Sequence, residues 1–237
     1  KTKDEVVDDI HSYQNEADIP LLIGVDEEGG TVVRVSSNPN LRETAFLSPK
    51  DTYADGGWDA VKRDAEEKAD LLLSLGINVN LAPVCDMTSD EYGFMYDRSF
   101  SVDVDMENRY VRTVVETSKS KKLGTVLKHF PGYGNNSDTH TGIAYDDRDY
   151  SEFENTDFKP FYQGIESGAD CILVSHNIVN CMDSEYPASL SQKVHDILRN
   201  EFKFDGVIMT DDLIMDAITD FTGDEACLLY TSPSPRD

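Results

Sequence analysis

The stretch GTVLKHFPGYG, residues 124–134, closes an apolar run with two ionisable side chains, Lys128 and His129. A turn rich in glycine and proline follows the pair. Four other runs have the same short, nearly continuous apolar character: IPLLIGVD (19–26), INVNLAPV (77–84), DCILVSHN (170–177) and DGVIMTDD (205–212). Such runs are typical of strands in a parallel sheet that is covered on both faces. We therefore expect five parallel strands.

Segments with helical spacing of apolar residues lie between these runs, and each of them reaches a glycine. The segments are 58–76, 106–124, 151–168 and 191–206, and their last residues are Gly76, Gly124, Gly168 and Gly206. Glycine is common just beyond the end of a helix, because it adopts the left-handed conformation without strain. Alternating strands and helices predict parallel βα units.

Ionisable residues gather where the predicted strands end. Asp26 ends the first run, Asp86 follows the second, and Asp211 and Asp212 end the last. The C-terminal strand ends carry the active site of a (β/α)8 barrel and the crevice of an open doubly wound sheet. No glycine-rich nucleotide motif follows a strand, which favours the barrel. Because a closed barrel needs eight strands, the predicted fold is α/β, a (β/α)8 TIM-type barrel truncated at both ends.

The composition excludes several classes of function. The 237 residues include 46 acidic and 21 basic side chains, a net charge of −25, which disfavours nucleic acid and anionic membranes as partners. No stretch approaches the ~20 apolar residues of a membrane-spanning helix. The acidity favours an exported or cell-surface enzyme, while the compartment and oligomeric state stay open. The cysteines show no metal-binding or disulfide spacing, and we expect buried free thiols at Cys85, Cys171, Cys181 and Cys227.

A set of sequence blocks extends along nearly the whole chain, to about Ala226: IPLLIGVDEEGGTVVR, NLAPVCDM, YDRSF, KHFPGYG with SDTH, PASLS and GVIMTDDLIMDAI. In this order they resemble the β-N-acetylglucosaminidase branch of glycoside hydrolase family 3. The resemblance implies a retaining exo-acting β-N-acetylhexosaminidase that removes terminal β-linked N-acetylglucosamine from cell-wall or chitin-type sugars. It implies a carbohydrate substrate and no metal or organic cofactor. The alternatives are a phosphorylase or β-glucosidase on the same scaffold, and an inactive sugar-binding paralogue.

The resemblance assigns three catalytic residues. Asp211, directly after VIMT, matches the nucleophile, and a carboxylate is suited to forming a covalent glycosyl-enzyme. His140 matches the acid/base, with Asp138 as its orienting partner. A histidine titrates near neutral pH, so one group donates a proton to the leaving oxygen and later takes one from water. For Asp212 we expect a helix cap or a supporting role.

The resemblance also assigns five substrate-binding residues, whose ammonium, imidazole, carboxylate and guanidinium groups suit the recognition of sugar hydroxyls. They are Asp26, Arg34, Arg98, Lys128 and His129. For Arg98 the alternative is a salt bridge to the adjacent Asp97.

One position departs from the family pattern, since the usual K-H-F-P-G-H-G has a tyrosine at Tyr133. A tyrosine does not titrate near neutrality, and we assign it no catalytic role. Gly29 and Gly30 are expected to let the chain turn tightly above the sheet. His176 and Asn177 end a strand, and lining the pocket is an open alternative for them.

The two ends of the chain differ from the rest. Residues 1–226 are expected to form a partial barrel, with two strands lying before Lys1 and one after Ala226. Residues 227–237, CLLYTSPSPRD, resemble a translated sequencing adapter and are expected to be a non-native tail.

Overall fold

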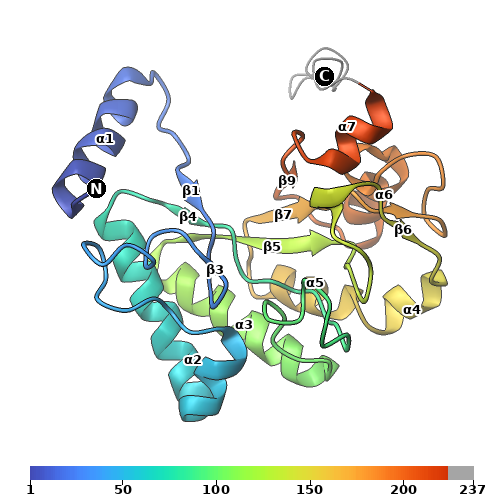
Figure 1. Cartoon of the computed structure of the whole chain (residues 1–237), viewed down its shortest axis with the longest axis horizontal. Coiled ribbons are helices and arrows are strands. Elements are labelled where there is room, and N and C mark those ends of the chain that lie inside the picture. Colours follow the sequence, from blue (N-terminus) through green and yellow to red (C-terminus); the bar gives the residue numbers. More distant parts are fainter. Residues whose placement is uncertain (224–237) are drawn as a thin grey trace.

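The structure is a computed structural model that describes residues 1–223. Its centre is a sheet of five parallel strands (Figure 1). In sheet order these are β1 (Gly24–Val25), β4 (Val79–Asn80), β5 (Gly124–Phe130), β7 (Cys171–Val174) and β9 (Val207–Thr210). Each lies in a run predicted to be a strand. Within the described residues β1 and β9 are the sheet's two edges, so the expected open arc of about five strands is confirmed.

Three helices cover one face of this sheet (Figure 1). They are α2 (Pro49–Ser74), α3 (Val104–Lys121) and α5 (Phe158–Glu166). Side chains of β5 and β7 that point toward them, Leu127 and Ile172, belong to the main apolar core. The alternate residues, Val126 and Leu173, point to the other, concave face and form a separate apolar cluster. This alternation follows from the two-residue period of a strand.

The helix starts follow from their capping residues. Ser48 caps α2, where Pro49 is the first helical residue, and Asp103 caps α3 through the N–H of Met106. The end predicted at Gly124 is wrong: α3 ends at Lys122, whose φ is 67°, and Gly124 begins β5.

The remaining predicted helices are shorter than expected. The segment 151–168 divides into α4 (Tyr150–Asn155) and α5, and the segment 191–206 divides into α6 (Gln192–Asp196) and a π-helical turn, η3 (Ile197–Glu201). The chain also forms elements that were not predicted, namely α1 (Lys3–Glu16), β6 (Tyr145–Asp146), β8 (Ile178–Val179) and the 3-10 turn η2 (Ala188–Leu190). The last described helix is α7 (Asp216–Thr222).

A tight hairpin follows β1 and positions several polar residues above the sheet. It consists of β2 (Glu27–Gly29) and β3 (Val32–Val33). Gly29 and Gly30 have φ angles of 106° and 65°, which side chains rarely adopt, so the expected tight turn is confirmed. A Cβ atom on Gly29 would lie 2.2 Å from the carbonyl oxygen of Leu47. The position therefore requires glycine.

The concave face of the sheet holds a cavity of about 670 Å³ at the amino ends of the strands. Apolar side chains line most of it, among them Leu22, Val79, Leu81, Val126 and Met209. The ionisable residues predicted to do chemistry lie at the opposite, carboxyl ends of the strands, so we do not assign this cavity a catalytic role.

Among the described cysteines, two are buried and one is exposed. Cys85 and Cys171 are buried free thiols as expected, but Cys181 is exposed, because it lies in the turn after β8. Cys227 and the adapter-like segment 227–237 lie outside the described residues.

Candidate active site

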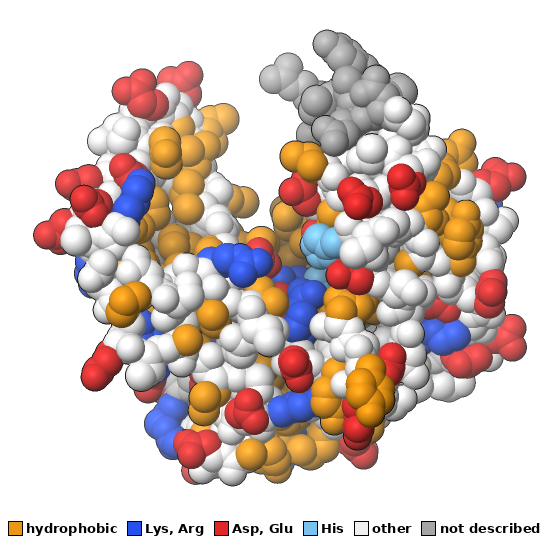
Figure 2. Space-filling view, in the orientation of Figure 1, with side chains coloured by type: hydrophobic (Ala, Val, Ile, Leu, Met, Phe, Trp, Pro, Cys, Tyr) orange, Lys and Arg blue, Asp and Glu red, His pale blue; other side chains and the backbone are white. Residues whose placement is uncertain are grey.

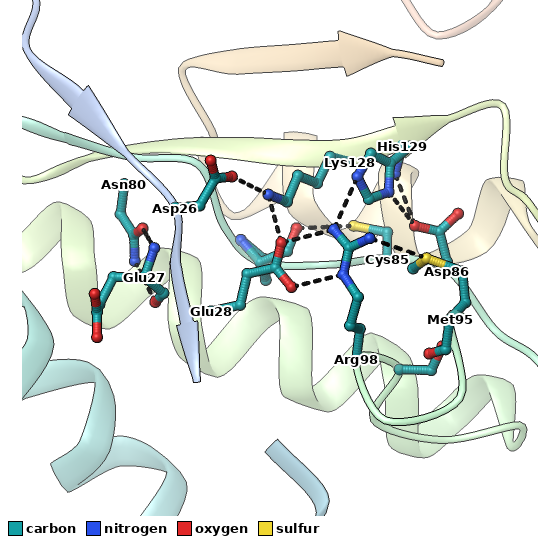
Figure 3. A network of polar contacts seen from close by, with 12 residues as sticks. Asp26, Glu27, Glu28, Asn80, Cys85, Asp86, Met95, Arg98, Lys128 and His129 are labelled. Carbon is teal, nitrogen blue, oxygen red and sulfur yellow. Dashed lines mark hydrogen bonds and ion pairs between the residues drawn. The ribbon is translucent and has the colours of Figure 1, made fainter. Parts of the chain in front are cut away.

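The candidate active site lies at the carboxyl ends of the five parallel strands. Basic and histidine side chains gather near the middle of the face in Figure 2, beside the hollow in the molecular surface. At their centre is a polar network of six residues from four segments of the chain (Figure 3). We call these residues the polar network: Asp26, Glu28, Asp86, Arg98, Lys128 and His129.

Lys128 is the buried cation at the centre of the polar network. Only 2% of its side chain is exposed, and its Nζ lies 2.6 Å from Asp26 Oδ1 and 2.6 Å from Glu28 Oε1. Asp26 remains one-third exposed, so one of its edges faces solvent. A buried ammonium needs such carboxylates, because burying an unpaired charge is costly.

Arg98 binds the same carboxylate from the other side. Its Nε and Nη2 donate to the two oxygens of Glu28 at 2.9 and 2.8 Å. The alternative pairing with Asp97 is not the one the structure shows. Burial alone would raise the pKa of Glu28, but the charge of Lys128 and the two hydrogen bonds from Arg98 lower it from 4.5 to about 2. Glu28 is therefore ionised at neutral pH.

His129 is held in one orientation by Asp86. Its Nδ1 lies 2.7 Å from Asp86 Oδ2, and its backbone N–H donates to the same oxygen at 2.9 Å. Its other nitrogen, Nε2, lies 3.2 Å from Arg98 Nη2. The imidazole of His129 thus lies between the carboxylate of Asp86 and the guanidinium of Arg98.

Lys128 and His129 are adjacent in β5, yet both side chains take part in the polar network. Regular alternation would send neighbouring side chains to opposite faces. The pairing of β5 with β7 is irregular at this point, because Leu127 pairs with Ile172 and Phe130 pairs with Val174. Such irregularities change the direction of a side chain next to an active site. The strand end thereby presents both groups to one place.

Asp138 and His140 form a pair on the loop beyond β5. Asp138 caps the short 3-10 helix η1 (Thr139–Thr141) through the N–H of His140, at 2.9 Å. The same Oδ1 lies 2.7 Å from His140 Nδ1. The carboxylate thus fixes the ring and leaves Nε2 for other contacts, and 60% of the His140 side chain is exposed. The arrangement suits proton transfer to a bound molecule.

Asp211 directly follows β9 and is partly buried. Burial alone would raise its pKa, but the charge of His129 and the N–H of Asp212, 2.9 Å from Oδ1, lower it below the ordinary value of 3.8. Asp211 is therefore a carboxylate at neutral pH, next to the polar network. An ionised carboxylate of this kind is a competent nucleophile.

Asp212 supports the turn after Asp211. Its Oδ1 accepts from the N–H of Ile214 at 3.0 Å, and its carbonyl oxygen lies 2.9 Å from His176 Nε2. It does not cap a helix, because α7 begins at Asp216. His176 is fully buried, and its Nδ1 contacts Ser189 Oγ at 2.7 Å. His176 therefore holds the turn rather than facing the pocket.

The structure brings together most of the residues assigned from the sequence. Asp26, Arg98, Lys128 and His129 share the polar network, while the Asp138–His140 pair forms its own contact. Arg34 is the exception. Its backbone N–H donates to Glu27 Oε2 at 3.0 Å, but within residues 1–223 its guanidinium takes no part in the polar network.

Two residues of the polar network, Glu28 and Asp86, were not assigned a role from the sequence. Glu28 stands within VDEEGG, between assigned positions, and Asp86 follows a predicted strand. Their partners, Arg98 and His129, lie 70 and 43 residues away along the chain. Their positions beside strand ends are the signal that could have revealed them.

The described residues contain no group of three or more His, Cys, Asp or Glu side chains that could hold a metal ion. Among residues 1–223 no helix is both long and apolar enough to cross a membrane.

A parallel sheet with ionisable groups at the carboxyl ends of its strands is the arrangement of a barrel-like fold with its site at that end. The sequence profile of the glycosyl hydrolase family 3 N-terminal domain matches residues 1–229. The chain belongs to glycosyl hydrolase family 3.

Individual relatives agree with this membership. A β-hexosaminidase of Nitrosomonas eutropha is 32% identical over 223 residues, which are 92% of this chain and 62% of that protein. A β-hexosaminidase of Hydrogenovibrio crunogenus is 31% identical over 85% of this chain and 57% of that protein. The chain thus spans about 60% of the length of these curated relatives.

Solved structures share the same fold. A family 3 β-N-acetylglucosaminidase from Paenibacillus superposes with a TM-score of 0.88 at 28% identity, covering 94% of this chain and 43% of that one. LpqI of M. tuberculosis superposes with a TM-score of 0.84 at 29% identity, covering 94% of this chain and 67% of that one.

Proposed function

We propose that this chain carries the catalytic site of a retaining exo-β-N-acetylglucosaminidase. The observation that carries the proposal is the pairing of His140 with Asp138 on a loop beyond β5, at 2.7 Å, in a site that also holds the ionised Asp211. The names of the similar proteins, β-hexosaminidase and β-N-acetylglucosaminidase, support this choice of activity. The natural substrate would be a cell-wall or chitin-type sugar with a terminal β-linked N-acetylglucosamine.

The reaction would proceed in two displacements. In the first, an oxygen of Asp211 bonds to the anomeric carbon while the bond to the leaving oxygen breaks, and His140 donates its proton to that oxygen. In the second, His140 takes a proton from water as the water oxygen bonds to the anomeric carbon and the ester to Asp211 breaks. Asp138 would hold the imidazole in the orientation that presents Nε2 to the leaving oxygen.

The polar network would hold the sugar. Asp26 offers a partly exposed carboxylate as an acceptor for hydroxyl groups, and Lys128 and Arg98 offer donors that the acidic partners keep charged. His129 is fixed by Asp86 and presents Nε2 on the opposite edge of its ring. Arg34 would contribute its guanidinium only if it moves toward a bound sugar.

The nucleophile is tested by trapping in the full-length protein. A 2-acetamido-5-fluoro glycoside inactivator should form an adduct that peptide mass spectrometry maps to Asp211. Asp211→Ala should lose nearly all turnover, and azide should restore part of it with formation of a glycosyl azide, because the small anion occupies the vacated space. The matched control is Asp212→Ala. Azide rescue of Asp212→Ala instead would show that the assignment is one residue off.

The acid/base is tested with leaving groups of different acidity. His140→Ala should lower kcat/KM for substrates with poor leaving groups by about 10²–10⁴-fold and for activated aryl glycosides far less, because only the former need a proton in the first displacement. Equal losses on both substrates would contradict the role. Product analysis in phosphate buffer separates hydrolysis from phosphorolysis, since a phosphorylase would release a sugar 1-phosphate.

A further inference from the structure

Tyr133 occupies the position at which the family pattern K-H-F-P-G-H-G has its second histidine. Its side chain makes several contacts in the site. It is 2% exposed, and its ring packs edge-on against His129 at 5.3 Å and against Phe94 at 5.1 Å between ring centroids. Its backbone N–H donates to Asp86 Oδ1 at 2.8 Å. Asp86 therefore holds both the backbone of Tyr133 and His129, while the ring of Tyr133 packs on His129 itself.

The hydroxyl group of Tyr133 reaches the other half of the site. It lies 2.6 Å from Thr139 Oγ1, and Thr139 is fully buried. Thr139 is the residue between Asp138 and His140. Its side chain points inward, while the side chains of its two neighbours are 30% and 60% exposed. The contact therefore connects Tyr133 to the short backbone segment that carries both Asp138 and His140.

This hydrogen bond is strong in its setting. Burial raises the pKa of Tyr133, so the hydroxyl keeps its proton and stays able to donate. Neither partner is exposed to water, and a buried hydrogen bond lost on one side leaves the other group unsatisfied. The same segment is also held at its edges, because Asn135 hydrogen-bonds Thr88 and Ser89, Asn136 Nδ2 donates to the Tyr145 carbonyl oxygen at 3.1 Å, and η1 lies against α7.

We propose that Tyr133 is a positioning residue for His140, and that its hydroxyl fixes the aspartate–histidine pair relative to the sugar-binding polar network through Thr139. This inference rests on the proposed function of His140 as acid/base. Tyr133 itself touches no reacting atom and transfers no proton. A histidine would not place a hydroxyl group at this depth, so the anchor belongs to this chain's own sequence.

The test uses Tyr133→Phe, which keeps the ring and removes only the oxygen, and Thr139→Val, which removes the partner hydroxyl at similar volume. Each should lower kcat/KM for a poor leaving group by about 10-fold or more, because small misplacements of a catalytic group cost up to about 100-fold. The kcat/KM for a dinitrophenyl glycoside should change less than about 3-fold, because this parameter reports only the first displacement, in which that leaving group needs no proton. The double variant should be no slower than the slower single variant, because both remove one contact.

The control is Tyr150→Phe. Tyr150 also donates from its hydroxyl, to Glu201 Oε2 at 2.8 Å, but on α4 and away from the His140 loop. This variant should leave the ratio of the two kcat/KM values unchanged. Equal losses on both substrates, or additive losses in the double variant, would overturn the positioning role.

Amide hydrogen exchange separates this inference from the proposed function. In Tyr133→Phe and Thr139→Val, exchange in residues 134–142 should accelerate by about 5-fold or more, because the anchor is worth on the order of 1 kcal/mol. If the unaltered protein cleaves no N-acetylglucosaminide but exchange accelerates, the anchor stands and the proposed function fails. If the unaltered protein is active while exchange and substrate ratio stay unchanged in both variants, the anchor fails.

Discussion

At the scale of single residues, Glu28 joins the two cations of the polar network, although no role was assigned to it from the sequence. Glu28 is 3% exposed and contacts Lys128 and Arg98, both of which are mostly buried. Without its carboxylate, Lys128 would keep Asp26 as its ion-pair partner in the polar network, and Arg98 would lose its ion pair there. The structure thus places an acidic residue between two sugar-binding candidates, where it sets their spacing.

The pH dependence of stability should carry the signature of Glu28. Its pKa is about 2 in the folded protein and 4.5 otherwise, so its stabilising effect is fully present above about pH 4.5 and is lost as the pH falls toward 2. Glu28→Gln should lower the free energy of unfolding at pH 7 by on the order of 3 kcal/mol, because it leaves two buried cations short of a partner. The difference from the unaltered protein should shrink toward pH 2.

Urea unfolding of the full-length protein between pH 2 and pH 7 measures this effect. Glu43→Gln is the control, because Glu43 is exposed. A Glu28→Gln variant as stable as the Glu43→Gln variant at pH 7 would show that the network contributes little.

Residue-scale prediction from the sequence was limited by distance along the chain. Asp138 and His140 are two residues apart, so their pairing follows from local spacing. Arg98 has an acidic neighbour in Asp97, and the sequence favours no choice between it and Glu28, 70 residues away. Only the fold makes that pairing, because it brings the hairpin after β1 against the segment that precedes α3.

At the scale of elements, the strands of the central sheet were predictable and the strands of the two small two-stranded sheets were not. The runs 124–130 and 205–212 are long enough for the apolar character of a buried strand to appear. By contrast, β2, β3, β6 and β8 have two or three residues each, too few for any period to be recognised. Helix ends also deviated, since α3 takes its left-handed end residue at Lys122 rather than at a glycine.

The hairpin of β2 and β3 should be intolerant of a side chain at Gly29. Gly29→Ala meets the Leu47 carbonyl oxygen at 2.2 Å and keeps a φ of 106°, so it should destabilise the protein by about 3 kcal/mol and disturb Glu28. Gly57→Ala is the matched control. Its φ of 62° and ψ of −151° also favour glycine, but a Cβ there meets nothing within 4 Å, so the loss should be smaller, about 1–2 kcal/mol.

Urea unfolding of both variants in the full-length protein measures the difference. Equal losses would mean that backbone conformation alone, and not the close approach to Leu47, makes glycine necessary at this turn.

At the scale of the whole molecule, the sheet has one covered and one uncovered face. Helices α2, α3 and α5 cover the first (Figure 1), whereas the concave face carries the 670 Å³ apolar cavity. Leu22 and Val207, which line that cavity, are 77% and 55% exposed. The strands β1 and β9 are each paired on one side only within residues 1–223.

These features predict the behaviour of a polypeptide of these 237 residues alone. Open strand edges and a large exposed apolar face promote association between chains. We expect material that is insoluble, or that elutes well above 26.5 kDa in size-exclusion chromatography, binds a hydrophobic dye and has no turnover. Leu22→Lys with Val207→Lys should raise the soluble fraction several-fold, because both charges lie on the uncovered face. Ile214→Lys, at a 66% exposed position after β9, is the control and should not. A monomeric, dye-free and active polypeptide would contradict this prediction.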